Sequence, residues 1–313
     1  MSRLNNKAVA VTLGDPFGIG PEIVKKAIDS SRLDKRARFV LIGDKTIFAR
    51  YKILPQANVS LLEVESRYNK VLKIGAVDQS AALASLNYLH QAICLIQSKK
   101  AHALVTAPVC KEGIAKILPS FCGHTDFLAE QFAVKKFGMM FVGPGIKTMI
   151  ATRHVAIKDV SIALTQKVIL STIELMHGAL KRFFKVSHPR IAVCGLNPHA
   201  GENGTIGREE ITRIIPAINK AKRRNIQTLG PFAADTLFIP SNLEKYDGIV
   251  AMYHDQGLAP VKALYFDKLV NLTVGLPFVR TSPAHGTAFD IAGKSIADPS
   301  SMIEAMNLAA RLS

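Results

Sequence analysis

Three histidines of this 313-residue chain follow apolar segments and could together hold a metal ion. They are His154 in ATRHVAI, His199 in LNPHAGE and His254 in MYHDQG. Three neutral imidazoles suit a borderline divalent ion that keeps an open position for substrate oxygens. Because 45 and 55 residues separate them, they meet only if the fold or a partner subunit brings them together. A hydrogen-bonded structural or surface histidine is the alternative for each.

A second group of residues has the chemistry to bind an anion. His124 and Thr125 precede an apolar helical pattern, so a hydroxyl and backbone amides are expected at a helix N-terminus, which favours negative charge. Lys262, Asn271 and Arg280 stand in or beside the apolar segments APVKAL, VNLTVG and PFVRTS. An unpaired cation there would be costly. The two cations therefore need either an internal salt bridge or a phosphate or carboxylate oxygen.

Three glycine-rich segments allow close backbone approach but match no nucleotide-binding fingerprint. Residues 14–22, GDPFGIGPE, form a turn that opens a helix, where backbone amides can approach an anion. This turn lacks the spacing of GxGxxG, and residues 143–148, GPGIKT, lack the adjacent GK[ST] of a P-loop. Residues 201–210 follow His199 and predict either a flexible wall or lid of a site or an ordinary mobile connection.

The elements that must position these residues are short β-branched strands that alternate with helical patterns. Five segments are typical of buried strands: 8–13, 39–42, 103–106, 191–196 and 248–252. The alternation predicts a three-layer α/β/α architecture with a largely parallel sheet. Polar residues follow four of the strands, and open α/β sheets bind ligands at the carboxyl ends of their strands. Turn chemistry explains Asp, Asn, Pro and Gly at these ends, but not His at two of them.

Composition bounds the class of protein. With 48% hydrophobic residues the chain can bury a large core, and it shows no internal repeat or low-complexity linker. The formal charge of +16 raises nucleic acid as a partner, but the basic residues are dispersed without interleaved aromatics, so most are expected on solvated faces. No apolar run predicts a signal peptide or a membrane span. Four cysteines without a CxxC pair fit a reducing cytoplasm, where we expect the protein: Cys94, Cys110, Cys122 and Cys194.

Seven motifs in order carry a family resemblance over about residues 8–310. They are GDPFGIGPE, TAPVCKEG, GHTDFLAE, LNPHAGENGTIGREE, GPFAADTLF, YDGIVAMYHDQGLAPVK and VNLTVGLPFVRTSPAHGTAFDIAG. The set resembles the 4-hydroxythreonine-4-phosphate dehydrogenases of pyridoxal phosphate (vitamin B6) biosynthesis. The resemblance implies the α/β/α fold of isocitrate and isopropylmalate dehydrogenases, with two intertwined subdomains of approximately residues 1–130 with 275–313, and 131–274.

The resemblance also assigns site residues. It implies a homodimer whose active site is shared between subunits, with a divalent metal (Zn, Mg, Co or Mn) on His154, His199 and His254, the last completing the site of the other subunit. The implied substrate contacts are His124, Thr125, Lys262, Asn271 and Arg280. The general base is not readable from the sequence, and Asp235 and Asp255 are its candidates. The residues that bind the cofactor are likewise not readable.

The implied reaction is oxidation of 4-phosphooxy-L-threonine by NAD, or NADP, followed by loss of carbon dioxide to give 3-amino-2-oxopropyl phosphate. The metal would polarise the reacting oxygen, and the nicotinamide would carry the redox chemistry. A dehydrogenase of 4-phosphothreonate or 4-phosphoerythronate is the close alternative, because it shares the metal and phosphate residues. A metal-dependent hydrolase and a nucleic-acid-binding module are the alternatives from other classes.

Two residues depart from the family motifs. Phe17 stands where a small residue is common, which could reshape the cofactor side of a cleft. Cys110 stands where TAPINK-type sequences carry Asn, which puts any polar role of that Asn in doubt.

Overall fold

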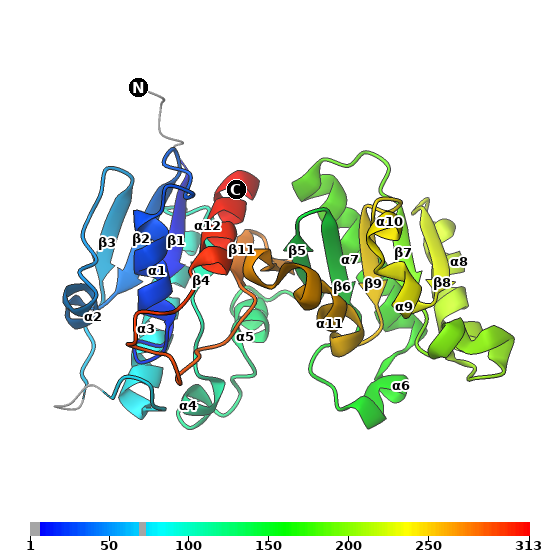
Figure 1. The fold of residues 1–313 in the computed structure, drawn as a ribbon, viewed down its shortest axis with the longest axis horizontal. Coiled ribbons are helices and arrows are strands. Elements are labelled where there is room, and N and C mark those ends of the chain that lie inside the picture. The colour runs from blue at the N-terminus through cyan, green and yellow to red at the C-terminus, as the bar shows by residue number, and fades with distance from the viewer. Residues whose placement is uncertain (1–6, 69–72) are drawn as a thin grey trace. The chain divides into compact units, whose positions relative to one another are not determined.

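A computed structural model describes residues 7–68 and 73–313 of the chain. The chain divides into two compact units, one made of Met1–Ala133 with Leu276–Ser313 and the other of Val134–Gly275. The chain therefore leaves the first unit, builds the second, and returns to complete the first. The blue-to-cyan and red segments of Figure 1 belong to the first unit, and the green-to-orange segments to the second.

The first unit contains a wholly parallel sheet in the order β3-β2-β1-β4-β11. Its strands are β1 (Ala8–Thr12), β2 (Arg38–Gly43), β3 (Val59–Glu63), β4 (Ala103–Thr106) and β11 (Val279–Pro283). Strand β1 is buried at every position, as expected for a parallel strand covered on both faces. After β1 the chain adds β2 and β3 on one side of it, and then β4 and β11 on the other side. The carboxyl ends of β1 and β4 therefore form a topological switch point, where such sheets bind ligands.

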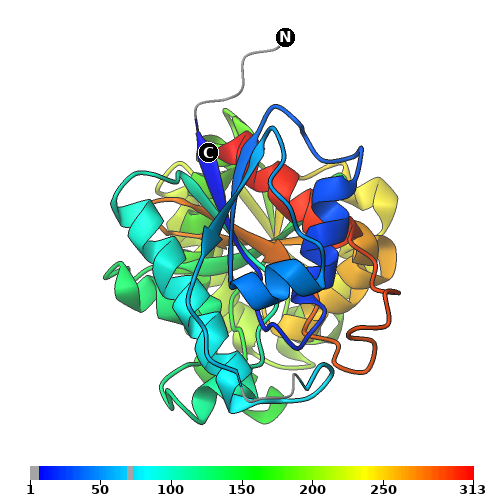
Figure 2. The same ribbon diagram turned by 90° about the vertical axis from the view of Figure 1, so that its left-hand side faces the viewer.

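Helices cover both faces of this sheet. They are α1 (Gly20–Asp29), α2 (Lys45–Arg50), α3 (Gln79–Gln97), α4 (Lys111–Ala115), α5 (His124–Gln131) and α12 (Ser300–Leu312). Helix α3 packs on β1, β2 and β4, whereas α12 packs on β1, β4 and β11 and against α1. Because parallel crossovers are right-handed, connections that step in opposite directions place α1 and α3 on opposite faces. Figure 2 shows the blue and cyan helices on the two sides of the strands.

The second unit contains a mixed sheet in the order β10-β5-β6-β9-β7-β8. Its strands are β5 (Gly138–Gly143), β6 (Ile146–Ile150), β7 (Ile191–Cys194), β8 (Thr228–Phe232), β9 (Gly248–Ala251) and β10 (Val270–Val274). Strand β5 is antiparallel to β6 and β10, and the other pairs are parallel. A two-residue Pro144-Gly145 turn joins β5 and β6, and Gly145 adopts the positive φ of 71° that the turn requires.

Helices also cover both faces of the second sheet. They are α6 (Val160–Ala163), α7 (Gln166–Phe184), α8 (Ile215–Lys222), α9 (Ala234–Leu237), α10 (Pro240–Leu243) and α11 (His254–Tyr265). Side chains alternate along β6: Met149 lies on the face of α7, while Thr148 and Ile150 contact Gly257 of α11. Helix α8 packs against α7, and therefore α7 and α8 lie opposite α11.

The predicted three-layer α/β/α class and largely parallel pairing are confirmed. All five predicted strands are present, within two residues at each end. The prediction missed the hairpin of β5 and β6, because residues 143–148 were considered only as a phosphate loop. None of the helices in the described residues is long and apolar enough to cross a membrane.

Candidate active site

Two of the three predicted metal ligands lie together at one edge of the second unit's sheet. Strands β6 and β9 are parallel neighbours, with Ile150 paired to Ala251. His154 follows the first strand by four residues and His254 follows the second by three, so the two loops leave the sheet at the same edge. Their imidazole rings lie 5.8 Å apart between centroids. Strand adjacency thus brings together residues that are 100 positions apart in the sequence.

A cavity of about 280 Å³ opens beside these rings. Both histidines and Asp255 line it, and Val155 and Ile157 provide apolar wall. Asp255 Oδ1 is 2.6 Å from His254 Nδ1, and this contact orients the ring. A histidine held in this way through one nitrogen presents the other to a ligand.

His199 is carried away from the sheet by a strained loop. It lies five residues beyond β7, in a turn at Pro198–Gly204. Six consecutive residues of this turn, 199–204, have positive φ values between 43° and 95°. Four of them are not glycine, and each left-handed residue of that kind costs on the order of 1 kcal/mol. Surrounding structure must therefore hold the turn in place.

Two adjacent glutamates hold this turn. Glu210 is 2% exposed, and its Oε1 accepts the backbone N–H groups of Leu196 and Asn197 at 2.7 and 2.8 Å. The Asn197 amide donates to Glu210 Oε2 at 2.8 Å and to Glu209 Oε2 at 2.9 Å. Hydrogen bonds from Ser161 and Asn197 lower the pKa of Glu209 to about 2. The loop predicted from residues 201–210 is thus held at its base, and His199, which precedes it, is exposed.

The donor set fits part of a metal site. Two imidazoles bound to one ion at a tetrahedral angle place their ring centres roughly 5–6 Å apart, given metal–nitrogen distances of about 2 Å. The rings of His154 and His254 meet that requirement. Within residues 7–68 and 73–313, however, no three His, Cys, Asp or Glu side chains of one chain are grouped to hold an ion. His199 is therefore not brought to the other two within one chain.

The predicted anion ligands of the first unit converge at the carboxyl end of β4. Arg280 on β11 is 2% exposed, and its Nη2 donates to Thr106 Oγ1 at 2.5 Å. Its Nη1 lies 3.5 Å from the hydroxyl of Thr125, which is in the first turn of α5. Burial lowers the pKa of Arg280 to about 9. The guanidinium therefore remains cationic at neutral pH inside a desolvated site.

His124 begins α5 next to this guanidinium. Burial, and then the positive charges of Arg280 and Lys111, hold its pKa well below the usual histidine range. The ring packs edge-on against Phe121, with centroids 6.2 Å apart. A neutral imidazole, a hydroxyl and the backbone amides of a helix N-terminus thus surround a buried cation, which is the chemistry of a phosphate site.

The remaining two predicted contacts belong to the second unit. Lys262 lies on α11, two turns after His254, and among the described residues its ammonium has no hydrogen-bond or ion-pair partner. The internal salt bridge that the sequence left open for Lys262 is therefore absent from the described residues. Asn271 on β10 is 9% exposed, and its Oδ1 has no hydrogen-bond partner. An amide oxygen buried in this way costs about 1–3 kcal/mol unless a ligand supplies a donor.

The two candidate bases differ in position. Asp255 lines the histidine cavity and its side chain is 82% exposed. Asp235 is exposed in α9 and bonds the backbone of Thr236, outside the lining of that cavity. The geometry within one chain therefore places Asp255, rather than Asp235, beside His154 and His254.

The glycine-rich turn after β1 lies at the switch point of the first unit. Asp15 in this turn is 1% exposed, and its Oδ1 accepts the N–H of Phe17 at 2.9 Å. Burial raises the pKa of Asp15 to about 6, although backbone amides partly offset this effect. Phe17 is 1% exposed and packs against Tyr68 at 5.6 Å, so its ring fills the interior of the unit and does not face a cleft.

Cys110 retains a structural function at its position. Its Sγ accepts the N–H of Gly113 at 3.3 Å and caps α4. Asparagine is a stronger N-cap than a thiol, so the departure from the motif weakens the cap without removing it.

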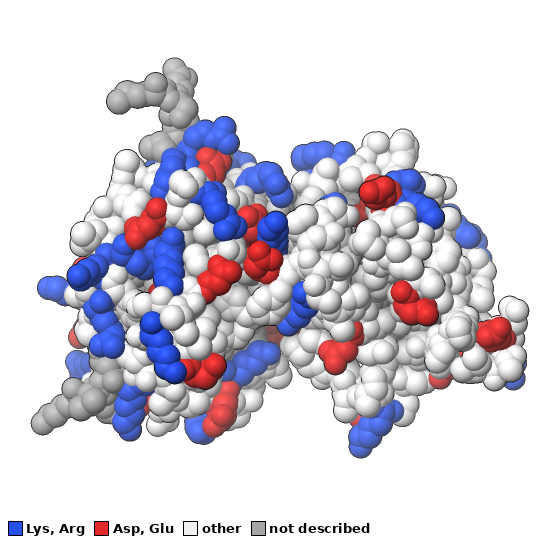
Figure 3. Space-filling view, in the orientation of Figure 1, with Lys and Arg blue, Asp and Glu red and all other residues white. Residues whose placement is uncertain are grey.

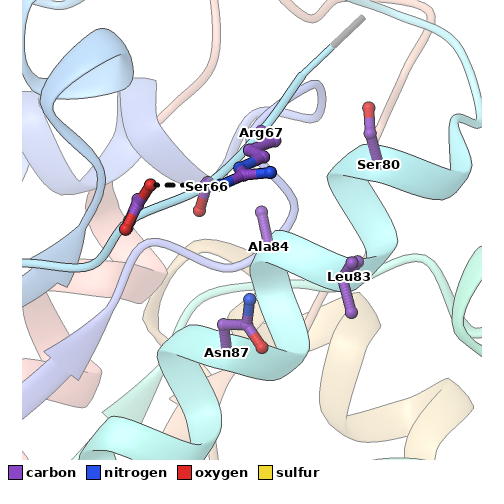
Figure 4. Close-up of a pocket in the computed structure, with 7 residues that line it drawn as sticks. Ser66, Arg67, Ser80, Leu83, Ala84 and Asn87 are labelled. Atoms are coloured by element: carbon purple, nitrogen blue, oxygen red, sulfur yellow. Dashed lines mark ion pairs between the residues drawn. The ribbon is translucent and has the colours of Figure 1, made fainter.

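A second cavity, of about 290 Å³, lies in the first unit between residues 65–67 and helix α3. Figure 4 shows its lining, with an ion pair between Glu65 and Arg67 at 4.0 Å. Both of these side chains are more than four-fifths exposed, and none of the predicted site residues lines the cavity. It is therefore not the candidate active site.

Sequence reasoning overlooked residues that position the site. Gln256 receives the N–H of Met252 and donates to the carbonyl of Gly195, both at 2.7 Å, so it ties the end of β9 to the end of β7. Asn197 and Glu210 hold the turn of His199 in a similar way. Their signal was present, since all three lie within four residues of a predicted strand end or within the predicted loop.

Comparisons with known proteins agree with this architecture. A 4-hydroxythreonine-4-phosphate dehydrogenase of Sulfurihydrogenibium sp. is 41% identical over 315 residues, covering 96% of this chain and 97% of the relative. An Oceanobacillus iheyensis protein, provisionally named D-threonate 4-phosphate dehydrogenase, is 38% identical with 97% coverage of both. The crystal structure of the Klebsiella pneumoniae 4-hydroxythreonine-4-phosphate dehydrogenase has 33% identity and a TM-score of 0.87, covering 100% of this chain and 99% of that one.

An isocitrate dehydrogenase of Methylococcus capsulatus shares the fold at a TM-score of 0.52 and 14% identity, over 97% of this chain and 83% of that one. The predicted isocitrate dehydrogenase-like architecture is thus confirmed. Fold, site and relatives together define an oxidoreductase of the dehydrogenase class. The model of the pyridoxal phosphate biosynthetic protein PdxA matches residues 22–309, and the chain belongs to that family.

Proposed function

We propose that this protein oxidises 4-phosphooxy-L-threonine with NAD and releases carbon dioxide, in pyridoxal 5'-phosphate biosynthesis. The names of its relatives support this substrate, since the relatives match nearly the whole chain at about 40% identity. The observation that carries the proposal is the buried Arg280 beside Thr125 and the neutral His124. A phosphate monoester matches a desolvated cation with hydroxyl and amide donors around it.

The reaction balances in two steps. The secondary alcohol loses hydride to NAD and a proton to a base, which gives 2-amino-3-oxo-4-phosphooxybutanoate and NADH. The C–C bond to the carboxylate then breaks, carbon dioxide leaves, and the carbon that carried it takes up a proton, which gives 3-amino-2-oxopropyl phosphate. NADP could replace NAD as hydride acceptor without changing this balance.

The residues of this chain divide the task. Arg280, Thr125 and His124 bind and orient the phosphate. Lys262 and Asn271 contribute an ammonium and an amide oxygen that have no hydrogen-bond partner among the described residues. Asp255 is the base candidate that lies beside the histidine pair.

We further propose that His154, His199 and His254 hold a divalent ion, of the Zn, Mg, Co or Mn class. When bound, it would act as a Lewis acid toward the oxygen of the reacting carbon. His254 is oriented for such a ligand by Asp255, and the absence of a third grouped ligand among residues 7–68 and 73–313 supports one from a partner.

A homodimer would supply that third ligand. Apolar side chains are exposed on the same part of the second unit, among them Ile157, Ile162 and Ile206 at 72%, 76% and 41%. Hydrogen bonds connect the segment around Ile157 and Ile162 to the one that follows Ile206. The Ser161 hydroxyl donates to Glu209, and the Ser161 carbonyl accepts from Arg213. Ring proximity within one chain favours His154 and His254 from one subunit with His199 from the other, in place of the division expected from the family.

The nucleic-acid alternative has no comparable support. On the face in Figure 3, lysine and arginine side chains are interspersed with aspartate and glutamate and form no continuous stripe. A cytoplasmic location remains part of the proposal.

A turnover panel tests the proposed function. Purified protein with added divalent ion is given 4-phosphooxy-L-threonine, 4-phosphothreonate or 4-phosphoerythronate, each with NAD and with NADP, and reduced cofactor is followed by absorbance. We expect the highest kcat/KM for 4-phosphooxy-L-threonine with NAD. A preference for either hydroxy acid would show that the protein is instead a dehydrogenase of 4-phosphothreonate or 4-phosphoerythronate. The name of the Oceanobacillus relative is of this kind.

A further inference from the structure

Lys111 occupies a defined place near the predicted anion ligands of the first unit. It is the first residue of α4, five residues beyond the end of β4, and the Cys110 cap fixes the start of that helix. Thr106, the last residue of β4, is the hydroxyl that accepts from buried Arg280. The same strand end therefore positions both Lys111 and a partner of Arg280.

The side chain of Lys111 extends to the start of α5. A Cβ placed on Gly123, the N-cap residue of α5, would lie 3.3 Å from Lys111 Cε and 3.6 Å from its Nζ. His124 follows directly. The ammonium therefore lies beside the helix end that also carries Thr125, and Figure 1 shows α4 and α5 next to each other in the first unit.

Lys111 has no counter-charge in the described chain. No hydrogen bond or ion pair involves its ammonium, although Lys116 in the same segment pairs with Glu112 at 2.9 Å. Lys111 and Arg280 both act electrostatically on His124. Two cations that converge on a neutral imidazole repel each other, and an anion between them converts this repulsion into attraction.

We propose that Lys111 is a further phosphate-binding residue, which contacts a phosphate monoester dianion held by Arg280, Thr125 and the N-terminus of α5. The proposal rests on the proposed function for the identity of the substrate, but not for the binding of phosphate. Lys111 supplies a point charge from the exposed side of the site, whereas Arg280 supplies the buried, directional contact. A solvated lysine without this function would make no difference to phosphate affinity.

The test compares Lys111→Ala with Lys116→Ala, a matched lysine whose ion pair lies on the surface. Inorganic phosphate is titrated into each protein by calorimetry, without turnover. We expect Lys111→Ala to weaken phosphate binding on the order of tenfold, as for loss of one partly exposed charged contact, and Lys116→Ala to leave it unchanged. Lys111→Arg should recover most of the affinity, and Lys111→Gln provides a neutral variant of similar length.

Two further readouts separate binding from a structural effect. Removal of the Lys111 charge should raise the pKa of His124 in an NMR titration, and should raise KM for the phosphorylated substrate more than it lowers kcat. Equal phosphate affinity in Lys111→Ala and Lys116→Ala, or no phosphate binding by the unmodified protein, would overturn the proposal. Failure of the unmodified protein to reduce NAD would instead count against the proposed function, because phosphate binding is measured independently.

Discussion

The buried carboxyl of Asp15 allows a quantitative prediction about stability. Its pKa is raised from 3.8 to about 6, chiefly because burial removes the carboxylate from water, and hydrogen bonds from backbone amides offset only part of this effect. The folded protein therefore keeps this proton over a pH range in which the unfolded chain has lost it. The contribution to stability is complete below about pH 4 and is lost as pH rises through about 6. A shift of about two units corresponds to about 3 kcal/mol.

Asp15→Asn removes the titration while keeping the shape of the side chain. Its carbonyl oxygen can still accept the N–H of Phe17, and its amide carries no charge at any pH. At pH 7.5 the variant should be more stable than the unmodified protein by up to about 3 kcal/mol, and at pH 4 the two should be nearly equal.

Urea unfolding, followed by circular dichroism at several pH values from 4 to 8, measures this difference. Asp34→Asn is the control, because Asp34 is partly exposed and a hydrogen bond from Arg36 lowers its pKa, so its substitution should not produce a gain at neutral pH. Parallel stability profiles of Asp15→Asn and the unmodified protein would refute the reasoning, since they would show that the buried carboxyl is ionised at no cost.

Three other predictions concern the active site. Arg280→Ala should reduce kcat/KM for the phosphorylated substrate roughly tenfold to 150-fold, from loss of about 1.5–3 kcal/mol, and an unchanged value in folded protein would assign Arg280 to the core alone. Chelation should abolish turnover, leave helical content intact and be reversed by a divalent ion; full activity of verified metal-free protein would contradict the metal proposal. Exchange of His199→Ala with His254→Ala subunits should restore about a quarter of the activity, because half the dimers are mixed and half their sites intact. The His154→Ala and His254→Ala mixture should stay inactive if these two share one chain's site, and recovery there would reinstate the division expected from the family.

Much of the fold was predictable because each local signal agrees with the tertiary structure. The β-branched runs at 8–13 and 248–252 are buried parallel strands, whose apolar character does not depend on their neighbours. The hairpin of β5 and β6 was not predictable in the same way, because methionine and glycine dominate its sequence, GMMFVGPGIKTMI, and carry a weak strand signal.

The candidate site shows where sequence reasoning ends. The residue types were readable: histidines after strands, and cations inside apolar segments. The proximity of His154 and His254 could not be predicted from the sequence. It depends on β6 and β9 being neighbours in the sheet, although β7 and β8 lie between them in the sequence. The direction of His199 was also hidden, since six residues in a row with positive φ contradict local preference, and Glu210 bonds the backbone just before them.

The measurement that tests the central claim most directly is the stoichiometry of a single reaction. Protein supplied with a divalent ion, NAD and 4-phosphooxy-L-threonine is allowed to react to completion, and NADH, carbon dioxide and the phosphorylated product are quantified by absorbance, trapping and mass spectrometry. The proposed function predicts one NADH and one carbon dioxide for each 3-amino-2-oxopropyl phosphate formed. Substrate consumption without reduced cofactor, as a hydrolase would give, or no reaction of this substrate while a phosphorylated hydroxy acid is oxidised, would contradict it.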